Sequence, residues 1–256
     1  MSGFYRRWEP LFAARDLARG PLLVFAPHPD DETIGSGGLI LAHRDAGCDL
    51  TCAVMTDGSL GDASSAHGAG YIEIRRAECR AAIAALGGGD LRFGTFGDGA
   101  LPLALETGEL EARVADLLAE RDWSTVVFPS PYELHPDHRA LGLAVLRVAA
   151  RDASERVWLA AEIGSFMPAN LMIEITALGE RKDAALRCYA SQLEHHDLIA
   201  KVQGVDRARS ANVDDVSVTR CEAYLRVLPG EVSTFLAESE TLLRTTDRMM
   251  PPVPWE

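Results

Sequence analysis

The fold class is decided by the stretch Pro21–Glu32, which reads PLLVFAPHPDDE. Its first six residues form a short, continuous apolar run, which is typical of a strand buried on both faces of a parallel sheet. A Gly-rich turn follows the stretch, and the residues from about Ile34 to Ala46 predict a helix. A buried strand that runs directly into a helix favours a βαβ unit.

The same alternation continues along the chain. Helices are predicted where apolar residues recur at helical spacing, and the helix that begins at Tyr71 is expected to end before Gly87-Gly88-Gly89. The further predicted strands are residues 50–55, 125–128, 157–161 and 171–175, and the further predicted helices are residues 71–86, 110–118, 141–148, 178–189 and 234–244. This order predicts an α/β fold with a mainly parallel sheet and right-handed crossovers. No linker-like stretch divides residues 1–256, so we expect a single domain.

Composition excludes several classes of protein. The formal net charge is −13, and the basic residues are scattered, so no basic face is available for a phosphate backbone. We therefore expect no nucleic-acid partner. No apolar run approaches the roughly 20 residues that cross a bilayer, so no transmembrane segment is expected. The association of several copies is left open by the sequence.

Cysteine usage and the first residues indicate the compartment. The chain has five cysteines, an odd number with no C-x-x-C pair, which argues for a reducing compartment. Residues 1–10 are polar and lack the apolar core of a signal peptide. We expect a cytoplasmic protein.

Two polar motifs follow predicted strands. The first is His28-Pro29-Asp30-Asp31-Glu32, and the second is His135-Pro136-Asp137-His138. In an open α/β sheet, ligands bind beyond the carboxyl ends of the strands. Imidazole and carboxylate are the natural zinc ligands where thiols are absent. The motifs therefore predict a catalytic zinc site, and iron(II) would suit two histidines and one carboxylate almost as well.

The alternative for each motif is helix capping. Asp30, Asp31 and Thr33 could cap the helix that follows the first motif, and Asp137 could cap the next one. For a single motif this explanation competes evenly with metal binding. It is much weaker for two motifs that each place His beside Asp after a different strand.

The motifs resemble those of the N-acetylglucosaminyl-phosphatidylinositol de-N-acetylase (PIG-L / LmbE-like) family of zinc-dependent deacetylases. Further segments fit the family pattern, and the likeness runs from about residue 22 to residue 225. These segments are Thr56-Asp57-Gly58, Arg75-Arg76-Ala77-Glu78, Asp98-Gly99, residues 182–192 and Glu222-Ala223-Tyr224. The resemblance implies a Rossmann-like three-layer αβα fold.

The resemblance also implies roles for particular residues. His28, Asp31 and His138 would bind the zinc, and Asp30 would be the general base. His135 would steady the tetrahedral intermediate or protonate the amine, with Asp137 orienting its ring. Two further residues, Arg75 and Asp98, would contact the substrate.

The expected reaction is metal-assisted removal of an N-acetyl group from a small amino-sugar-like substrate, with release of acetate and a free amine. Two alternatives remain: hydrolysis of another amide, such as a conjugate amide or a longer acyl group, and a Rossmann-like module that binds a sugar or nucleotide without chemistry. The eukaryotic family member is membrane-anchored, whereas no anchor is expected here, which puts a lipid-linked substrate in doubt.

Several weaker features have structural explanations. Gly35-Ser36-Gly37-Gly38 has the wrong spacing for a phosphate loop, so a packing role is favoured. Arg75 and Glu78 could form a surface ion pair instead of serving the substrate. His43 is expected on an exposed helix face. The adjacent His195 and His196 suit joint metal binding poorly. The segment around His67 is favoured as a plain surface loop over a lid, and residues 189–192 are favoured as structural.

Overall fold

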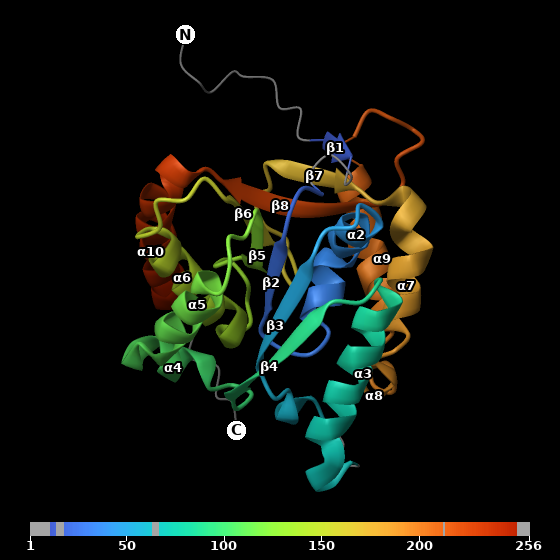
Figure 1. Ribbon diagram of the computed structural model, residues 1–256, viewed down its shortest axis with the longest axis horizontal. Helices are drawn as coiled ribbons and strands as arrows, with labels where there is room; N and C mark the ends of the chain where they lie inside the picture. Colours follow the sequence, from blue (N-terminus) through green and yellow to red (C-terminus); the bar gives the residue numbers. More distant parts are fainter. Residues whose placement is uncertain (1–10, 14–17, 63–66, 212, 250–256) are drawn as a thin grey trace.

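A computed structural model describes residues 11–13, 18–62, 67–211 and 213–249 of the chain. Within these ranges, eight strands form one sheet in the order β1-β7-β8-β6-β5-β2-β3-β4 (Figure 1). The strands are β1 (Leu11–Ala13), β2 (Leu22–Ala26), β3 (Leu50–Thr56), β4 (Asp90–Phe96), β5 (Thr125–Pro129), β6 (Val157–Ala161), β7 (Leu171–Glu174) and β8 (Cys221–Val227). The polar segment 1–10 lies outside the described residues, as do residues 63–66 of the loop near His67.

The sheet is mainly parallel, as predicted. β2 pairs in parallel with both β3 and β5, and the pairs β3–β4, β5–β6 and β1–β7 are parallel as well. β8 is the exception, because it runs antiparallel to its neighbours β6 and β7. β1, β4 and β8 were not predicted from the sequence.

Helices cover both faces of the sheet, which makes three layers (Figure 1). One face carries α2 (Asp31–Asp45), α3 (Tyr71–Ala85), α7 (Gly179–Leu186), α8 (Ala190–Leu193) and α9 (Leu198–Ser210). The other face carries α4 (Leu101–Thr107), α5 (Glu109–Ala119), α6 (Pro136–Ala149) and α10 (Val232–Met249). None of these helices combines the length and apolar character that crossing a membrane requires.

The apolar run of β2 is explained by this layering. Leu22, Val24 and Ala26 belong to the core cluster beneath α2 and α3, whereas Leu23 and Phe25 belong to the cluster beneath α4, α5 and α6. All five β2 side chains are buried. A strand with helices on both faces needs apolar residues at every position, which removes the usual alternation.

Helix α2 is buried on almost all sides, and this corrects the expectation for His43. The His43 side chain is fully buried, and its Nδ1 lies 2.9 Å from the carbonyl oxygen of Leu39. The glycines earlier in α2 permit this close packing. A Cβ on Gly38 would come within 2.4 Å of Ile175, and one on Gly35 within 2.9 Å of Ile163. The packing role predicted for these glycines is confirmed.

The strand order sets the position of the candidate site. The chain moves from β2 to β3 and β4 in one direction along the sheet, and it places β5 and β6 on the other side of β2. The carboxyl edge between β2 and β5 is therefore a switch point of the kind where open α/β sheets bind ligands. Both predicted motifs begin at this edge, after Ala26 and after Pro129.

Candidate metal centre

The two motifs meet through Asp31, the first residue of α2. Its Oδ2 lies 3.1 Å from His28 Nδ1 and 3.2 Å from His138 Nε2. The same oxygen accepts a hydrogen bond from the backbone N–H of His28 at 3.0 Å, which fixes the turn between strand and helix. One carboxylate oxygen is thus held between two imidazole nitrogens from segments more than a hundred residues apart.

The remote nitrogen of His28 faces two more carboxylates. Nε2 lies 3.0 Å from Asp137 Oδ2 and 3.1 Å from Asp98 Oδ1. Asp98 follows β4, and its other oxygen accepts the N–H of Leu60 at 3.0 Å. A metal-binding histidine commonly donates its second ring N–H to such a carboxylate, which fixes the tautomer and the ring orientation.

The position of Asp137 differs from the one predicted. Its carboxylate was expected to orient His135, but it contacts His28 and accepts N–H groups from Gly99 at 2.7 Å and Leu101 at 3.0 Å. The reason is that Asp137 lies inside α6, whose N-cap is His135, and its fully buried side chain points to the start of α4. The capping explanation also fails for Asp30, whose side chain makes no N-cap hydrogen bond to α2.

His138 has a similar carboxylate behind it, which sequence reasoning missed. Its Nδ1 lies 3.4 Å from Oε2 of the buried Glu133. The Glu133 carboxylate is itself held by the backbone N–H groups of Ile163, Gly164 and Ser165 at 2.9 to 3.3 Å. Glu133 lies just two residues before the second motif, but nothing in the local pattern distinguishes it from a loop glutamate.

His135 is the most exposed of the three imidazoles. Its ring centroid lies 4.8 Å from that of His28 and 5.0 Å from that of His138. Its Nδ1 accepts the backbone N–H of Asp137 at 3.2 Å, so in the neutral ring Nε2 carries the proton. Partial burial, reinforced by the two neighbouring imidazoles, lowers the pKa of His135, which favours this neutral, hydrogen-bond-donating form.

Asp30 has a strained backbone. Its φ of 126° is the only positive value at a non-glycine position among the described residues. The conformation is held from several sides: the backbone N–H of Asp30 donates to Glu32 Oε2 at 3.1 Å, and Arg75 Nη2 donates to Asp30 Oδ2 at 3.1 Å and to the carbonyl of Pro29. Strain that the surroundings maintain is concentrated at functional sites.

Arg75 does not form the surface ion pair weighed as an alternative. Its side chain is buried in α3 and pairs with Asp30, whereas Glu78 accepts hydrogen bonds from the backbone and hydroxyl of Ser191 at 2.7 Å. Nε and Nη1 of Arg75 have no hydrogen-bond partner within the described part of the chain. The substrate contacts expected for Arg75 and Asp98 stay predictions.

Electrostatics divide the two adjacent aspartates. Burial raises the pKa of Asp30 to about 7, although the Arg75 guanidinium opposes the rise. Asp31 is buried as well, but the imidazoles of His138 and His28 hold its pKa well below the usual range. Burial disfavours the charged form of His138, yet the Asp31 carboxylate prevails and raises the pKa of His138 to about 9.

The described residues contain two overlapping groups that could hold a metal ion. Ligand atoms of His28, His135 and His138 lie within 4.8 Å of one another, and so do those of His28, Asp98 and Asp137. The predicted set has Asp31 in place of His135. Its separations of 3.1 and 3.2 Å are close to the ~3.3 Å between ligands of a tetrahedral zinc ion with bonds of about 2.0–2.1 Å. Imidazoles and carboxylates are the donor types that such an ion takes, and the ligand set His28, Asp31 and His138 stays a prediction.

The other histidines lie apart from this group. His195 and His196 are exposed beyond α8, and His67 stacks on Tyr71 at a centroid distance of 5.4 Å. Tyr189 is fully buried, and its hydroxyl donates to Glu32, which braces the first motif from behind. This position agrees with the structural role predicted for residues 189–192.

Sequence comparisons agree with the two motifs. Residues 23–149 match the family described as PIG-L: GlcNAc-PI de-N-acetylase. The chain is 35% identical over 190 residues to a probable N-acetyl-alpha-D-glucosaminyl L-malate deacetylase 2 of Bacillus anthracis, covering 68% of this chain and 81% of the relative. It is 30% identical over 203 residues to the protein of that name in Bacillus cereus, covering 73% and 91%.

A third relative is matched over a shorter region. The diacetylchitobiose deacetylase of Thermococcus kodakarensis is 34% identical over 125 residues, which are 47% of this chain and 46% of that protein. Among solved structures, the N,N'-diacetylchitobiose deacetylase of Pyrococcus horikoshii has a TM-score of 0.72 at 24% identity, covering 82% of this chain and 85% of that one. The structural likeness supports the three-layer α/β fold.

Proposed function

The chain belongs to the PIG-L family of GlcNAc-PI de-N-acetylases, and from that premise we propose that it is a zinc-dependent N-deacetylase of a small amino-sugar-like substrate. The observation that carries the proposal is Asp31 held between His28 and His138, with carboxylates behind both imidazoles. A protein that only bound a sugar would need neither this donor set nor a strained aspartate beside it.

The metal would be held by His28 Nδ1, Asp31 and His138 Nε2. Two imidazoles and one carboxylate leave coordination positions free, as catalytic zinc sites do. Such an ion polarises the scissile carbonyl and activates a water. Zinc is the ion we propose, and iron(II) is the competing one, because the same ligand set also suits it.

The protein's own residues would carry the protons. Asp30 would take a proton from the attacking water as the C–O bond forms, and a carboxylate with a pKa of about 7 is well matched to that task near neutral pH. His135 would donate a hydrogen bond from Nε2 to the developing oxyanion. As the C–N bond breaks, the nitrogen would receive the proton that Asp30 took from the water, and acetate and a free amine would leave.

The substrate class is proposed from the relatives. Their names specify an N-acetylglucosaminyl malate and a diacetylated chitobiose, both N-acetylated amino sugars. Arg75 and Asp98 are proposed to contact the sugar, as the family resemblance implies. All five cysteines are free thiols, which supports a cytoplasmic location.

Two variants test the proposal. Asp30→Asn should keep the metal but lower acetate release from N-acetylglucosamine-type compounds by about 10²–10⁴-fold, because only the base is removed. His28→Gln should lose both metal and activity. Elemental analysis and an acetate assay on the same preparations give both readouts. Full activity in Asp30→Asn would show that another group is the base.

A further inference from the structure

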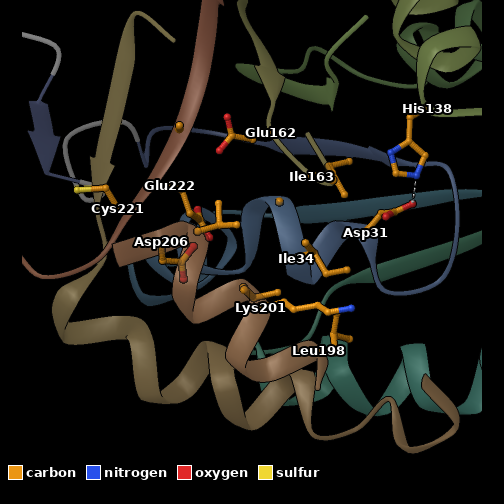
Figure 2. A pocket seen from close by; sticks show the side chains of 15 residues that line it. Asp31, Ile34, His138, Glu162, Ile163, Leu198, Lys201, Asp206, Cys221 and Glu222 are labelled. Atoms are coloured by element: carbon orange, nitrogen blue, oxygen red, sulfur yellow. Dashed lines mark ion pairs between the residues drawn. The ribbon is translucent and has the colours of Figure 1, made fainter. Parts of the chain in front are cut away.

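A cavity of about 270 Å³ opens beside the candidate metal centre. Asp31 and His138 lie at one end of it and Cys221 at the other, with Ile34 and Ile163 between them (Figure 2). Its remaining wall includes one face of α9, on which apolar residues recur at the helical spacing i, i+4 and i+7. The apolar members of that face are Leu198, Val202 and Val205.

The charged groups in the wall are already neutralised. Glu162 pairs with Arg209, Nε to Oε1 at 2.9 Å. Two further carboxylates of the wall, Glu222 and Asp206, pair with Lys182 at 2.8 Å and 3.1 Å. Lys201 is exposed, so its amine can reach solvent. A ligand inside the cavity would therefore find apolar side chains as its main free partners, which is unfavourable for a sugar with hydroxyls on every side.

The proton-carrying residues determine which part of the substrate faces this cavity. The nitrogen of the scissile amide must lie within reach of Asp30 or His135 to be protonated. Neither residue lines the cavity, whereas the proposed metal ligands Asp31 and His138 do. With the carbonyl at the metal and the nitrogen toward Asp30 and His135, the remaining substituent of the carbonyl carbon points into the cavity. That substituent is the acyl chain.

We propose that this cavity is an acyl-chain pocket and that the enzyme prefers N-acyl groups longer than acetyl, in the range of about four to eight carbons. The inference rests on the amide hydrolysis of the proposed function and changes the preferred acyl group from acetyl to a longer one. The methyl of an acetyl group is about the size of a water, whose share of liquid volume is ~30 Å³, so acetyl would leave most of the 270 Å³ unfilled. The cavity is also smaller than the ~300–1,000 Å³ of pockets that enclose drug-sized ligands, which sets an upper limit on chain length.

The test is a series of N-acyl glucosamines with acetyl, butanoyl, hexanoyl and dodecanoyl chains, assayed for free amine with the metal-loaded enzyme. Each methylene that enters the cavity should raise kcat/KM by up to about fourfold, so hexanoyl should exceed acetyl by at least about tenfold. Dodecanoyl should fall again, because its end cannot enter.

Variants connect the preference to the cavity. Val205→Phe and, independently, Leu198→Phe should lower the hexanoyl-to-acetyl ratio by about tenfold, since a phenyl ring takes the space of several methylenes. Ala208→Phe is the matched control: it lies exposed on α9, away from the cavity, and should leave the ratio unchanged. Two cavity variants are used so that one misfolded protein does not decide the outcome.

The possible results distinguish failure of the acyl-chain pocket from failure of the deacetylase proposal. A ratio that favours hexanoyl and falls in the cavity variants supports the acyl-chain pocket. Acetyl as the best substrate, or a ratio that the cavity variants do not change, overturns the pocket but leaves the deacetylase proposal standing. Hydrolysis of no N-acyl glucosamine by fully metal-loaded enzyme contradicts both proposals.

Discussion

Two clusters of buried charge both contact α2, one through Asp31 and the other through Glu222, and they are built differently. In the first cluster, Lys182 and Arg220 supply fixed cations. Lys182 contacts Asp206 and Glu222, and Arg220 contacts Asp206 at 2.7 Å and Asp183 at 2.9 Å. Burial would favour loss of the Lys182 proton, but its two carboxylates outweigh that effect and raise its pKa. Each carboxylate thus has a permanent cation.

In the second cluster the carboxylates face imidazoles instead. Asp31, Asp98, Asp137 and Glu133 surround His28 and His138, and the nearby Arg75 is engaged by Asp30. Neutral imidazoles cannot balance these charges. The histidines must take up protons or share a metal cation, and buried charge without compensation is costly. The first cluster holds the fold together, whereas the second has the composition of an ion-binding site.

The largest effect is expected from removing the fixed cation. Lys182→Met leaves Asp206 and Glu222 without their shared partner, so the free energy of unfolding should fall by about 3–5 kcal/mol. Urea unfolding measures the change. Lys201, the only other lysine of the chain, is exposed, and Lys201→Met should change stability by no more than about 0.5 kcal/mol. Equal effects of the two substitutions would contradict the structural role of the first cluster.

A smaller effect is expected from the carboxylate behind His138. Glu133→Gln removes the charge that faces Nδ1 and should weaken metal affinity by about 10–100-fold. Competition with a chromophoric chelator at fixed pH measures the affinity, and the visible spectrum of the cobalt-substituted protein should shift as well. The control is Glu174→Gln, because Glu174 also accepts a backbone N–H, at 2.6 Å from Thr176, but contacts no imidazole. Unchanged affinity in Glu133→Gln would remove Glu133 from the site.

The smallest effect concerns a buried imidazole without a carboxylate. Burial lowers the pKa of His43, and its Nε2 has no partner in the described structure. As the pH falls, His43 therefore takes up a proton at a higher pH in the unfolded chain than in the folded one. The stability that neutral His43 contributes is fully present above about pH 6.5 and declines as the pH falls from there toward the folded pKa. The stability of wild type relative to His43→Gln should decline between pH 7 and pH 5. A constant difference across that range would contradict the shift.

The elements around β2 could be predicted because the sequence features that indicate them lie within the elements themselves or directly after them. A continuous apolar run identifies a strand covered on both faces, and the motifs that follow β2 and β5 place the site at the switch point. β4 and β8 lacked such a signal. β4 has mostly half-exposed residues, since it is the edge strand, and β8 carries the buried Glu222, whose Oε1 accepts the N–H of Gly38 at 2.7 Å. A charge in a core strand is intelligible only after its partners are known.

The same limit applies to single residues. His43 was expected on an exposed helix face, but α2 is enclosed by α7 and β8, which are far away in the sequence. The carboxylate of Asp137 turned to His28 because the N–H groups of Gly99 and Leu101 hold it there. The role of Glu133 can be recognised only in the folded structure, where backbone N–H groups of residues 163–165 hold its carboxylate. Tertiary contacts determine these positions, and local pattern does not encode them.

The most direct test of the candidate metal centre is the metal content of the purified protein, determined by elemental analysis together with acetate release before and after chelation. We expect about one zinc or iron ion per chain, activity that disappears on chelation, and activity that returns when the metal is restored. A protein that binds no metal after reconstitution, yet remains folded, would contradict the assignment of the imidazole–carboxylate cluster as a metal centre.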